Sequence, residues 1–448
     1  MENEYELLNQ KAKKPEEIER WCTKEDMSEV KRCVHLMKKG YEVQKISVIN
    51  NIDRYMNEPG ANEELFSLII DSMMDWDDKM QKECANSFIK PLESNKIDKR
   101  NKEKVAKAAV QITTDEDNTE NEELVEAWIK VLEAVAGKLC MQFVSESVIK
   151  QIKDLPSLKN PFQRRIRGNK LVFGVAKSVG EEGFDKDPHL MKVVMGICSD
   201  NNYKIRRDGV IFLKEYLKAN RSNIINSPRF RDIYLPTLVD FLNDEDMHIQ
   251  IDAIEAVNEI MDQLSVEELE RDLLPCFLQF LDIENQSQIQ IILRVASVFG
   301  ELVNKISHFG LHLTYKREII QFFKEICEHE DDDVRHMAAY NLPCMNLLYK
   351  PLEKELEISF SEIYLRFSED ERWKIKECVS QSLHEAFKLA EEEEDTSSLR
   401  RCFLGFILDN SRQIQQIMNK NLATIVARYG NRHTVETFKG RTPYVDSQ

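Results

Sequence analysis

Few residues in this sequence could carry out chemistry on their own. His308 and His312 are four residues apart, the spacing of two metal ligands on one helix face, but Gly310 lies between them and no carboxylate stands at a matching position. The acids from Asp331 to Asp333 could bind a cation, yet they lack the loop pattern of an EF-hand. No GxGxxG before a helix, P-loop, HExxH or GxSxG motif is present. The sequence therefore predicts no metal site, no cofactor and no enzyme.

A tryptophan in a charged segment is the strongest sign of a binding site. Trp373 stands among Glu369, Asp370, Glu371 and Arg372, two residues before an apolar position. Tryptophan and arginine are the residues most often found at binding hot spots. The alternative is that the ring folds back on the adjacent turn, near residues 409–412. We predict that inter-helix turns form a partner-binding ridge that includes Asp244, Glu245, Asp246, Asp331, Asp332, Arg372 and Trp373.

The elements that position these turns are helical hairpins, and the segment from residue 316 to residue 349 is the clearest example. Ile319, Phe323 and Ile326 recur at helical spacing in its first half. The charged run HEDDD interrupts this pattern and places acids where they favour the start of a second helix. Val334 and Leu342 then belong to a single apolar stripe. Such a pair leaves apolar surface uncovered, so it must stack on copies of itself.

Copies of this hairpin recur along the chain. Their signature is an acid, four residues, an apolar and often β-branched residue, and then Arg, Lys or Gln. The apolar marks differ by about 41 residues, which is the period of HEAT repeats. Ordinary helix patterning in a bundle is the alternative, but it does not explain a constant phase. The marks are Val43, Met80, Leu124, Phe162, Ile205, Ile249, Ile289, Val334, Ile375 and Ile414.

Each position of the signature has a physical purpose. The acid can accept backbone N–H groups of the turn, and the apolar residue can fill the gap between the two helices. The long polar side chain that follows can reach the acid of the next repeat. We expect an inter-repeat ladder built from Asp200, Arg206, Asp244, Gln250, Arg335, Asp370, Lys376, Asp409 and Gln415.

Length and composition agree with an all-α chain. Its 448 residues include only 14 glycines and 12 prolines, which leaves little material for β-turns. The predicted fold class is a HEAT-repeat α-solenoid of about ten hairpins. We place a disordered N-terminus at residues 1–14, the solenoid at residues 15–430 and a flexible C-terminal tail at residues 431–448.

Charge and cysteine usage limit the partners and the compartment. The net charge of −17 argues against nucleic acid, because phosphate binding needs a basic face. The basic stretches 94–104 and 164–170 are interpreted as solvated helix faces. No run of eighteen apolar residues predicts a membrane span, and the N-terminus is too polar for a secretory signal. The ten cysteines, of which Cys327, Cys344 and Cys378 lie in apolar stripes, indicate reduced thiols in the cytoplasm.

Two stretches resemble a known family. The segments KKPEEIERWCTKEDMSEVKRCVHLMKKGYEVQKISVI and DDDVRHMAAYNLPCM are similar to the regulatory subunit 4 family of protein phosphatase 4, and more broadly to the HEAT scaffold subunits of 2A-type phosphatases. The resemblance extends over roughly residues 13–430. It implies a non-catalytic scaffold that binds the catalytic subunit of a serine/threonine phosphatase. The stretch ERWKIK, residues 371–376, looks like the turn by which such scaffolds present a tryptophan.

Two functions therefore compete. The first is a phosphatase regulatory scaffold. The second is a phosphatase-independent solenoid adaptor that binds other proteins, as a structural component of a larger assembly or as an importin-like carrier. A carrier would line its concave helices with repeated tryptophans and asparagines, whereas the four tryptophans here are not aligned between repeats. The carrier is thus the weaker form of the second hypothesis.

Overall fold

The computed structural model of the chain describes residues 27–115, 121–220, 229–261, 264–283, 288–390 and 393–439. Throughout these segments the regular structure is helical and no strand occurs, so the predicted all-α class is confirmed. The chain divides into two compact units, Met1–Phe212 and Leu213–Gln448. No helix in the described segments is long and apolar enough to cross a bilayer. The predicted disordered segment 1–14 lies outside the described residues.

Helical hairpins follow one another in the first unit. Each has a first helix, or a group of short helical turns, and then a second helix. In chain order the elements are α3 (Glu29–Lys39) with α4 (Glu42–Asn50) and α5 (Ile52–Tyr55); η1 (Ala61–Phe66) and α6 (Ser67–Met73) with α7 (Asp78–Glu93); α8 (Lys99–Thr114) with α9 (Glu122–Ala136); α10 (Met141–Phe143), η3 (Val144–Ile149) and α11 (Lys150–Ile152) with α12 (Phe162–Lys186); and α13 (Pro188–Cys198) with α14 (Tyr203–Ala219).

The second unit begins within α14 and continues the same pattern. Its elements are η4 (Phe230–Tyr234) and α16 (Leu235–Leu242) with α17 (Met247–Ile260); α18 (Val266–Glu268), η6 (Leu269–Leu273) and α19 (Leu274–Gln279) with α20 (Ile289–Ser307); α21 (Leu311–Thr314) and α22 (Lys316–Glu328) with α23 (Asp332–Tyr349); η7 (Lys350–Leu352), α24 (Glu353–Leu356) and α25 (Phe360–Ser368) with α26 (Trp373–Leu389); and α27 (Glu393–Ile407) with α28 (Arg412–Lys439).

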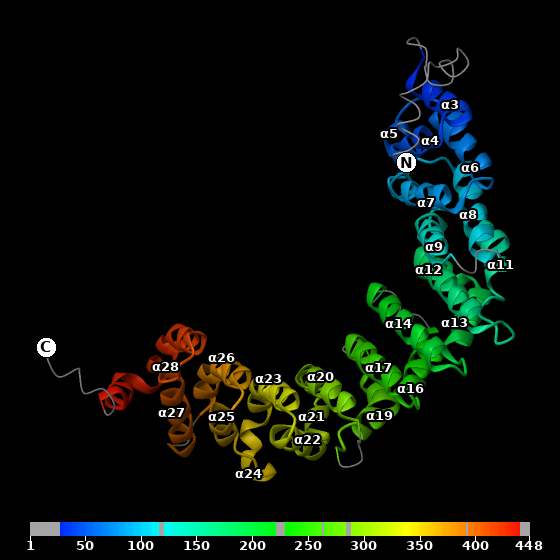
Figure 1. Cartoon of the computed structure of the whole chain (residues 1–448). Coiled ribbons are helices and arrows are strands. Elements are labelled where there is room, and N and C mark those ends of the chain that lie inside the picture. The colour runs from blue at the N-terminus through cyan, green and yellow to red at the C-terminus, as the bar shows by residue number, and fades with distance from the viewer. Residues whose placement is uncertain are drawn as a thin grey trace. The chain divides into compact units, whose positions relative to one another are not determined.

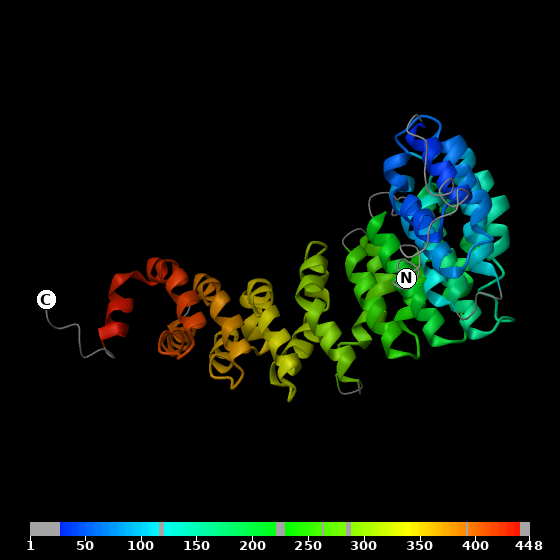
Figure 2. The ribbon, with the colours of Figure 1, turned by 45° about the horizontal axis from the view of Figure 1, so that its top comes forward.

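Within each unit the helices form two layers. Figures 1 and 2 show the second helices α17, α20, α23, α26 and α28 in one row of the second unit, with the first helices in the other. Neighbouring second helices pack directly on one another, as α20 does on α23 and α23 on α26. In the first unit, α7, α9 and α12 form the corresponding row. Stacking therefore covers the apolar surface that a single hairpin leaves exposed.

The third residue of the second helix is the apolar position that anchors most hairpins. Val334 and Ile375 occupy it and are fully buried, as are most of the other marks. Three marks assigned from the sequence are corrected. Val43 is the second residue of α4 and is 43% exposed. Phe162 and Ile289 are only half-buried, because α12 and α20 begin at these residues themselves and not two residues before them.

The last helix extends past the predicted boundary at residue 430. α28 continues to Lys439, so the segment predicted as a flexible tail from residue 431 starts as helix. Residues 431–439 contain neither glycine nor proline, which explains why the helical run is not interrupted there. Residues 440–448 lie outside the described part of the chain.

Polar side chains of one second helix form hydrogen bonds with the backbone of the preceding second helix. Asn341 on α23 donates to the Ala296 carbonyl (2.6 Å) and accepts from the Gly300 N–H (3.0 Å), the acceptor and donor of one turn of α20. A Cβ atom on Gly300 would lie 2.6 Å from Asn341 Oδ1. Ser178 on α12 bridges Gly137 N–H and Glu133 C=O of α9 in the same way. Small residues at these points let the neighbouring helix approach closely.

Ion pairs add a second connection between the second helices of the second unit. Glu255 on α17 accepts from Lys214 on α14 (2.8 Å) and from Arg294 on α20. Lys218 pairs with Glu259 at 2.8 Å, also between α14 and α17. One carboxylate thus joins three consecutive repeats.

Changing Val334 to Asp should strongly destabilise the chain. The substitution places an unpaired carboxylate at a fully buried site between α22 and α23, at a cost of about 3 kcal/mol or more. Thermal unfolding measures the loss. Hydrogen exchange should show faster opening in the adjacent hairpins as well, because each repeat is stabilised by its neighbours.

Val43→Asp is the matched control for that substitution. Val43 received the same assignment from the sequence but is exposed, so its substitution should change the free energy of unfolding by only about 0.5 kcal/mol. A melting temperature for Val334→Asp within a degree of the parent's would show that the hairpin register is wrong.

Candidate protein-docking ridge

The turn between the two helices of a hairpin is built around one acceptor side chain. Asp370 Oδ1 accepts the N–H of Arg372 at 2.9 Å, two residues further on, and Asp200, Asp244 and Asp409 make the same contact at 2.8 to 2.9 Å. His329 takes the place of the acid in its turn, with Nδ1 accepting the Asp331 N–H at 3.0 Å. These contacts fix the turn backbone and so determine which of the following side chains face outward.

The long side chain at the fourth position of the second helix completes the turn. Arg335 Nη1 donates to the His329 carbonyl at 2.9 Å, and Arg206 makes the equivalent bond to Asp200 O at 2.9 Å. Gln415 bonds to the Asp409 carbonyl at 2.7 Å. These residues therefore satisfy carbonyl groups just beyond the first helix, a role that the sequence analysis did not assign to them.

Arg335–Asp370 and Arg165–Asp200 are bonds from one repeat to the acid of the next. Arg335 Nε lies 3.0 Å from Asp370 Oδ2. Arg165 lies 2.6 Å from Asp200, whose side chain is only 2% exposed. Arg165 was not among the expected ladder residues because the apolar mark was placed at Phe162. Counting four residues from the helix start after Pro161 would have found it.

Lys376 of the expected ladder does not make that contact. Lys376 and Asp409 are both described, and no hydrogen bond or ion pair joins them. A lysine lacks the planar fork with which arginine bonds the turn and the next acid together. The acid expected to face Gln250 is Glu284, which lies outside the described segments.

Two neighbouring turns are joined by a compact charge cluster. Arg335 bonds to Asp332 (2.8 Å) as well as to Asp370, and Arg372 bonds to Asp332 from the following turn. Arg372 is the main cause, ahead of Arg335, of the lowered pKa of Asp332. The Arg335 pKa is raised, chiefly by Asp370. The cluster fixes the direction of Arg372 although most of its side chain is exposed.

Trp373 stands directly beside this cluster. It is the first residue of α26 and is 52% exposed, while Ile375 two residues later is fully buried. About half of the Trp373 surface is thus open to solvent. An indole exposed next to a fixed guanidinium offers a partner both apolar surface and a directed donor.

The acids of the predicted ridge have structural duties as well. Asp246 caps α17 by accepting the His248 N–H at 2.9 Å, and Asp331 caps α23 by accepting from Asp333 and Val334. Asp244 forms the turn contact described above, and Glu245 is exposed. The turns at residues 244–246 and 331–332 therefore combine fixed backbone geometry with negative charge at the surface.

The basic stretches are partly exposed, as the sequence suggested for solvated helix faces, and several of their cations also form ion pairs. Lys96 lies 2.7 Å from Asp53 and Lys104 lies 2.6 Å from Asp71, each of them an acid of an earlier hairpin. Lys170 is 3.7 Å from Glu126, and Arg165 pairs with Asp200 as described. These cations are used to connect repeats.

His312, Cys344 and Cys378 are side chains that could carry chemistry, and each of them is half-buried. No cluster of three or more metal-ligating side chains exists among the described residues. The His312 ring packs against Tyr349 at 5.9 Å, and burial lowers the pKa of His312. The nine described cysteines form no disulfide, and burial raises the pKa of Cys344 and Cys378 to about 11, so these two thiols remain protonated at neutral pH.

Two curated proteins are similar in sequence to this chain. They are the serine/threonine-protein phosphatase 4 regulatory subunit 4 of Mus musculus, 20% identical over 388 residues, and that of Homo sapiens, 20% identical over 380 residues. Each alignment covers 78% of this chain and 42% of the relative, so the chain spans less than half the length of these proteins. No protein-family model matches the chain. The resemblance to this family is confirmed at 20% identity.

Solved structures with the same fold include karyopherins. The crystal structure of Kap121p matches with a TM-score of 0.64 at 11% identity, over 91% of this chain and 42% of that chain. Importin beta matches with a TM-score of 0.52 at 12% identity, over 90% of this chain and 50% of that chain. At such identities the likeness concerns the fold alone, and it confirms the predicted helical-repeat solenoid.

Removing one partner of the buried Arg165–Asp200 pair should destabilise the first unit. Arg165→Met leaves the Asp200 carboxylate buried without its guanidinium, at a cost of about 3 kcal/mol or more. The double variant Arg165→Met/Asp200→Asn should recover much of that loss, since the amide oxygen can still accept the Asn202 N–H. Urea unfolding of the parent, both single variants and the double variant measures the coupling. Equal stability of Arg165→Met and the double variant would contradict this interpretation.

Proposed function

We propose that this chain is a non-catalytic HEAT-repeat scaffold that binds the catalytic subunit of a serine/threonine phosphatase of the protein phosphatase 4 or 2A type. The docking surface is the turn ridge formed by Asp244, Glu245, Asp246, Asp331, Asp332, Arg372 and Trp373. The observation that carries the proposal is the exposed Trp373 beside Arg372, whose direction is fixed by Asp332.

Two further observations support this assignment. The sequence relatives are regulatory subunits by name, and they are similar to this chain over most of its length. The turns that form the ridge are rigid, because each is fixed by a side-chain acceptor and, in the turn before α23, by a fold-back arginine. A preorganised surface loses little conformational entropy when a globular partner binds. The proposed compartment is the cytoplasm, where the unpaired cysteines would stay reduced.

Replacing the two central ridge residues should weaken phosphatase binding without unfolding the chain. We expect Trp373→Ala/Arg372→Ala to reduce the affinity for a purified protein phosphatase 4 catalytic subunit by about 2 kcal/mol or more, which is roughly thirtyfold. The melting temperature should stay nearly unchanged, because Trp373 is exposed. Binding of the catalytic subunit to surface-immobilised chain measures the affinity, and calorimetry measures the melting temperature.

Tyr203→Ala is the matched control. Tyr203 is an exposed aromatic residue at the start of α14, the position that Trp373 occupies in α26, but it lies in the first unit and outside the ridge. It should leave phosphatase binding unchanged. Equal binding by the double variant and the parent would remove this turn from the interface. A parent chain that binds no phosphatase catalytic subunit would favour the phosphatase-independent adaptor.

A further inference from the structure

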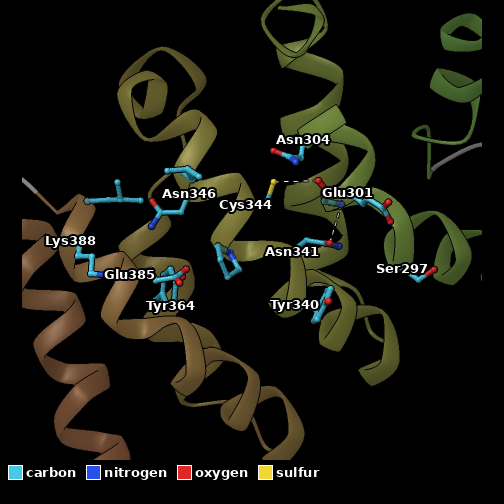
Figure 3. A pocket seen from close by; sticks show the side chains of 14 residues that line it. Ser297, Glu301, Asn304, Tyr340, Asn341, Cys344, Asn346, Tyr364, Glu385 and Lys388 are labelled. Carbon is cyan, nitrogen blue, oxygen red and sulfur yellow. Dashed lines mark hydrogen bonds between the residues drawn. The ribbon is translucent and has the colours of Figure 1, made fainter. Parts of the chain in front are cut away.

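A groove crosses the layer of second helices in the second unit, further along these helices than the turns that form the docking ridge. It has a volume of about 820 Å³ and is lined by side chains of α20, α23 and α26, with Tyr364 of α25 contributing as well. Figure 3 shows Asn341 and Cys344 turned toward α20, and Asn346 on the side of α23 toward Glu385 and Lys388 of α26. The proposed phosphatase contact does not use this groove.

Asn346 is the feature of the groove that the fold does not explain. Asn346 is 3% exposed, and its Oδ1 atom has no hydrogen-bond partner among the described residues. Burying an amide oxygen without a donor costs about 1 to 3 kcal/mol, so such a group calls for a partner from outside the chain. Asn341, five residues earlier, shows the contrast because both ends of its amide are bonded to the α20 backbone.

The amide of Asn346 suits a peptide backbone as its partner. A chain in extended conformation presents alternating N–H and C=O groups, so one of its N–H groups can bond to the Asn346 oxygen.

Apolar side chains flank these polar groups. Tyr340 is 67% exposed and Leu347 is 62% exposed, although both line the groove. They are seven residues apart, which places them two turns apart on one face of α23. A ligand with an apolar side chain would cover surface that now contacts water.

Charge indicates what else the ligand carries. The lining contains two carboxylates, Glu301 and Glu385, and one ammonium, Lys388. Glu301 is paired with Lys305 at 2.9 Å, whereas the ion pair of Glu385 is with His384 at 3.9 Å, an imidazole that is charged only when protonated. Lys388 has no partner among the described residues. With the whole chain at −17, a cationic ligand is favoured over an anionic one, and Lys388 can donate to a ligand carbonyl.

We propose that this groove binds an extended peptide segment of a partner protein that carries an apolar side chain and a lysine or arginine. Asn346 binds the peptide backbone, Tyr340 and Leu347 cover its apolar side chain, and Glu385 pairs with its cation. The proposal is independent of the phosphatase contact.

A phage-displayed dodecapeptide library selected on the full chain tests this site. Selected sequences should share an apolar and a basic residue, and a labelled synthetic peptide of the best sequence gives the dissociation constant by fluorescence anisotropy. Asn346→Leu should weaken binding about tenfold while keeping or raising the melting temperature, because the buried amide is replaced by an apolar side chain of similar size. A purely structural asparagine would not produce that combination.

A charge exchange tests the assignment of Glu385. Glu385→Lys should weaken the same peptide about tenfold, and a peptide with its basic residue changed to Glu should bind this variant better than it binds the parent. Glu318→Lys is the control, since Glu318 is an exposed acid on the first helix α22, away from the groove. It should leave the dissociation constant unchanged.

Several results would overturn the proposal. The first is a selection that yields no peptide or only acidic peptides, and the second is unchanged peptide binding by Asn346→Leu. The third is self-association of the chain in sedimentation equilibrium that Tyr340→Ser abolishes, because a second copy of the chain would then cover the groove. Asn346→Leu should still bind the phosphatase subunit, and Trp373→Ala/Arg372→Ala should still bind the peptide. Loss of only one activity in each variant separates the failure of this proposal from the failure of the proposed function.

Discussion

The chain has to reverse direction between the two helices of every hairpin without leaving the backbone groups at the helix ends unsatisfied. An aspartate such as Asp370, or His329 in its place, accepts the N–H two residues on, and a long side chain such as Arg335 donates to the carbonyl just past the first helix. The next helix then starts at a fixed angle, and its third residue enters the space between the helices. The turn therefore determines which side chains are buried, such as Val334, and which are exposed, such as Trp373.

The strong copies of the turn could be predicted from the sequence because all their determinants are local. Asp370, Ile375 and Lys376 lie within seven consecutive residues, and the structure places Asp370 in the turn and Ile375 in the core. The fainter copies were placed one or two residues away from the true position. At Phe162 the helix begins after Pro161 and Ser157 stands where the signature has its acid, so the period alone could not fix the phase. Trp373, a large apolar ring in a charged turn, could be singled out from the sequence for the same local reason, and it is 52% exposed.

Contacts between repeats could not be predicted in the same way. Asn341 and Gly300 are 41 residues apart, and nothing in either local sequence shows that the amide bonds to the backbone of the neighbouring helix. The position depends on how closely α20 and α23 approach, which is decided by the side chains of both helices together. The same holds for Arg165, a member of a basic stretch whose charge is used by Asp200 in the next hairpin. The orphan amide of Asn346 and its groove belong to this class of features.

One helix, α23, contributes to both proposed surfaces. Asp332 and Arg335 at its start organise the ridge cluster, and Tyr340, Asn346 and Leu347 further along line the groove. Asp332 and Asn346 are fourteen residues apart, which corresponds to about 21 Å along a helix. A globular subunit at the turns and an extended peptide across the second-helix layer can therefore contact the same repeat without competing for the same atoms. Because each repeat is stabilised mainly by its neighbours, ligands that tighten the packing of α23 on α20 and α26 would act on a shared set of helices. This arrangement would let a short array of hairpins bring an enzyme and a substrate-bearing segment together.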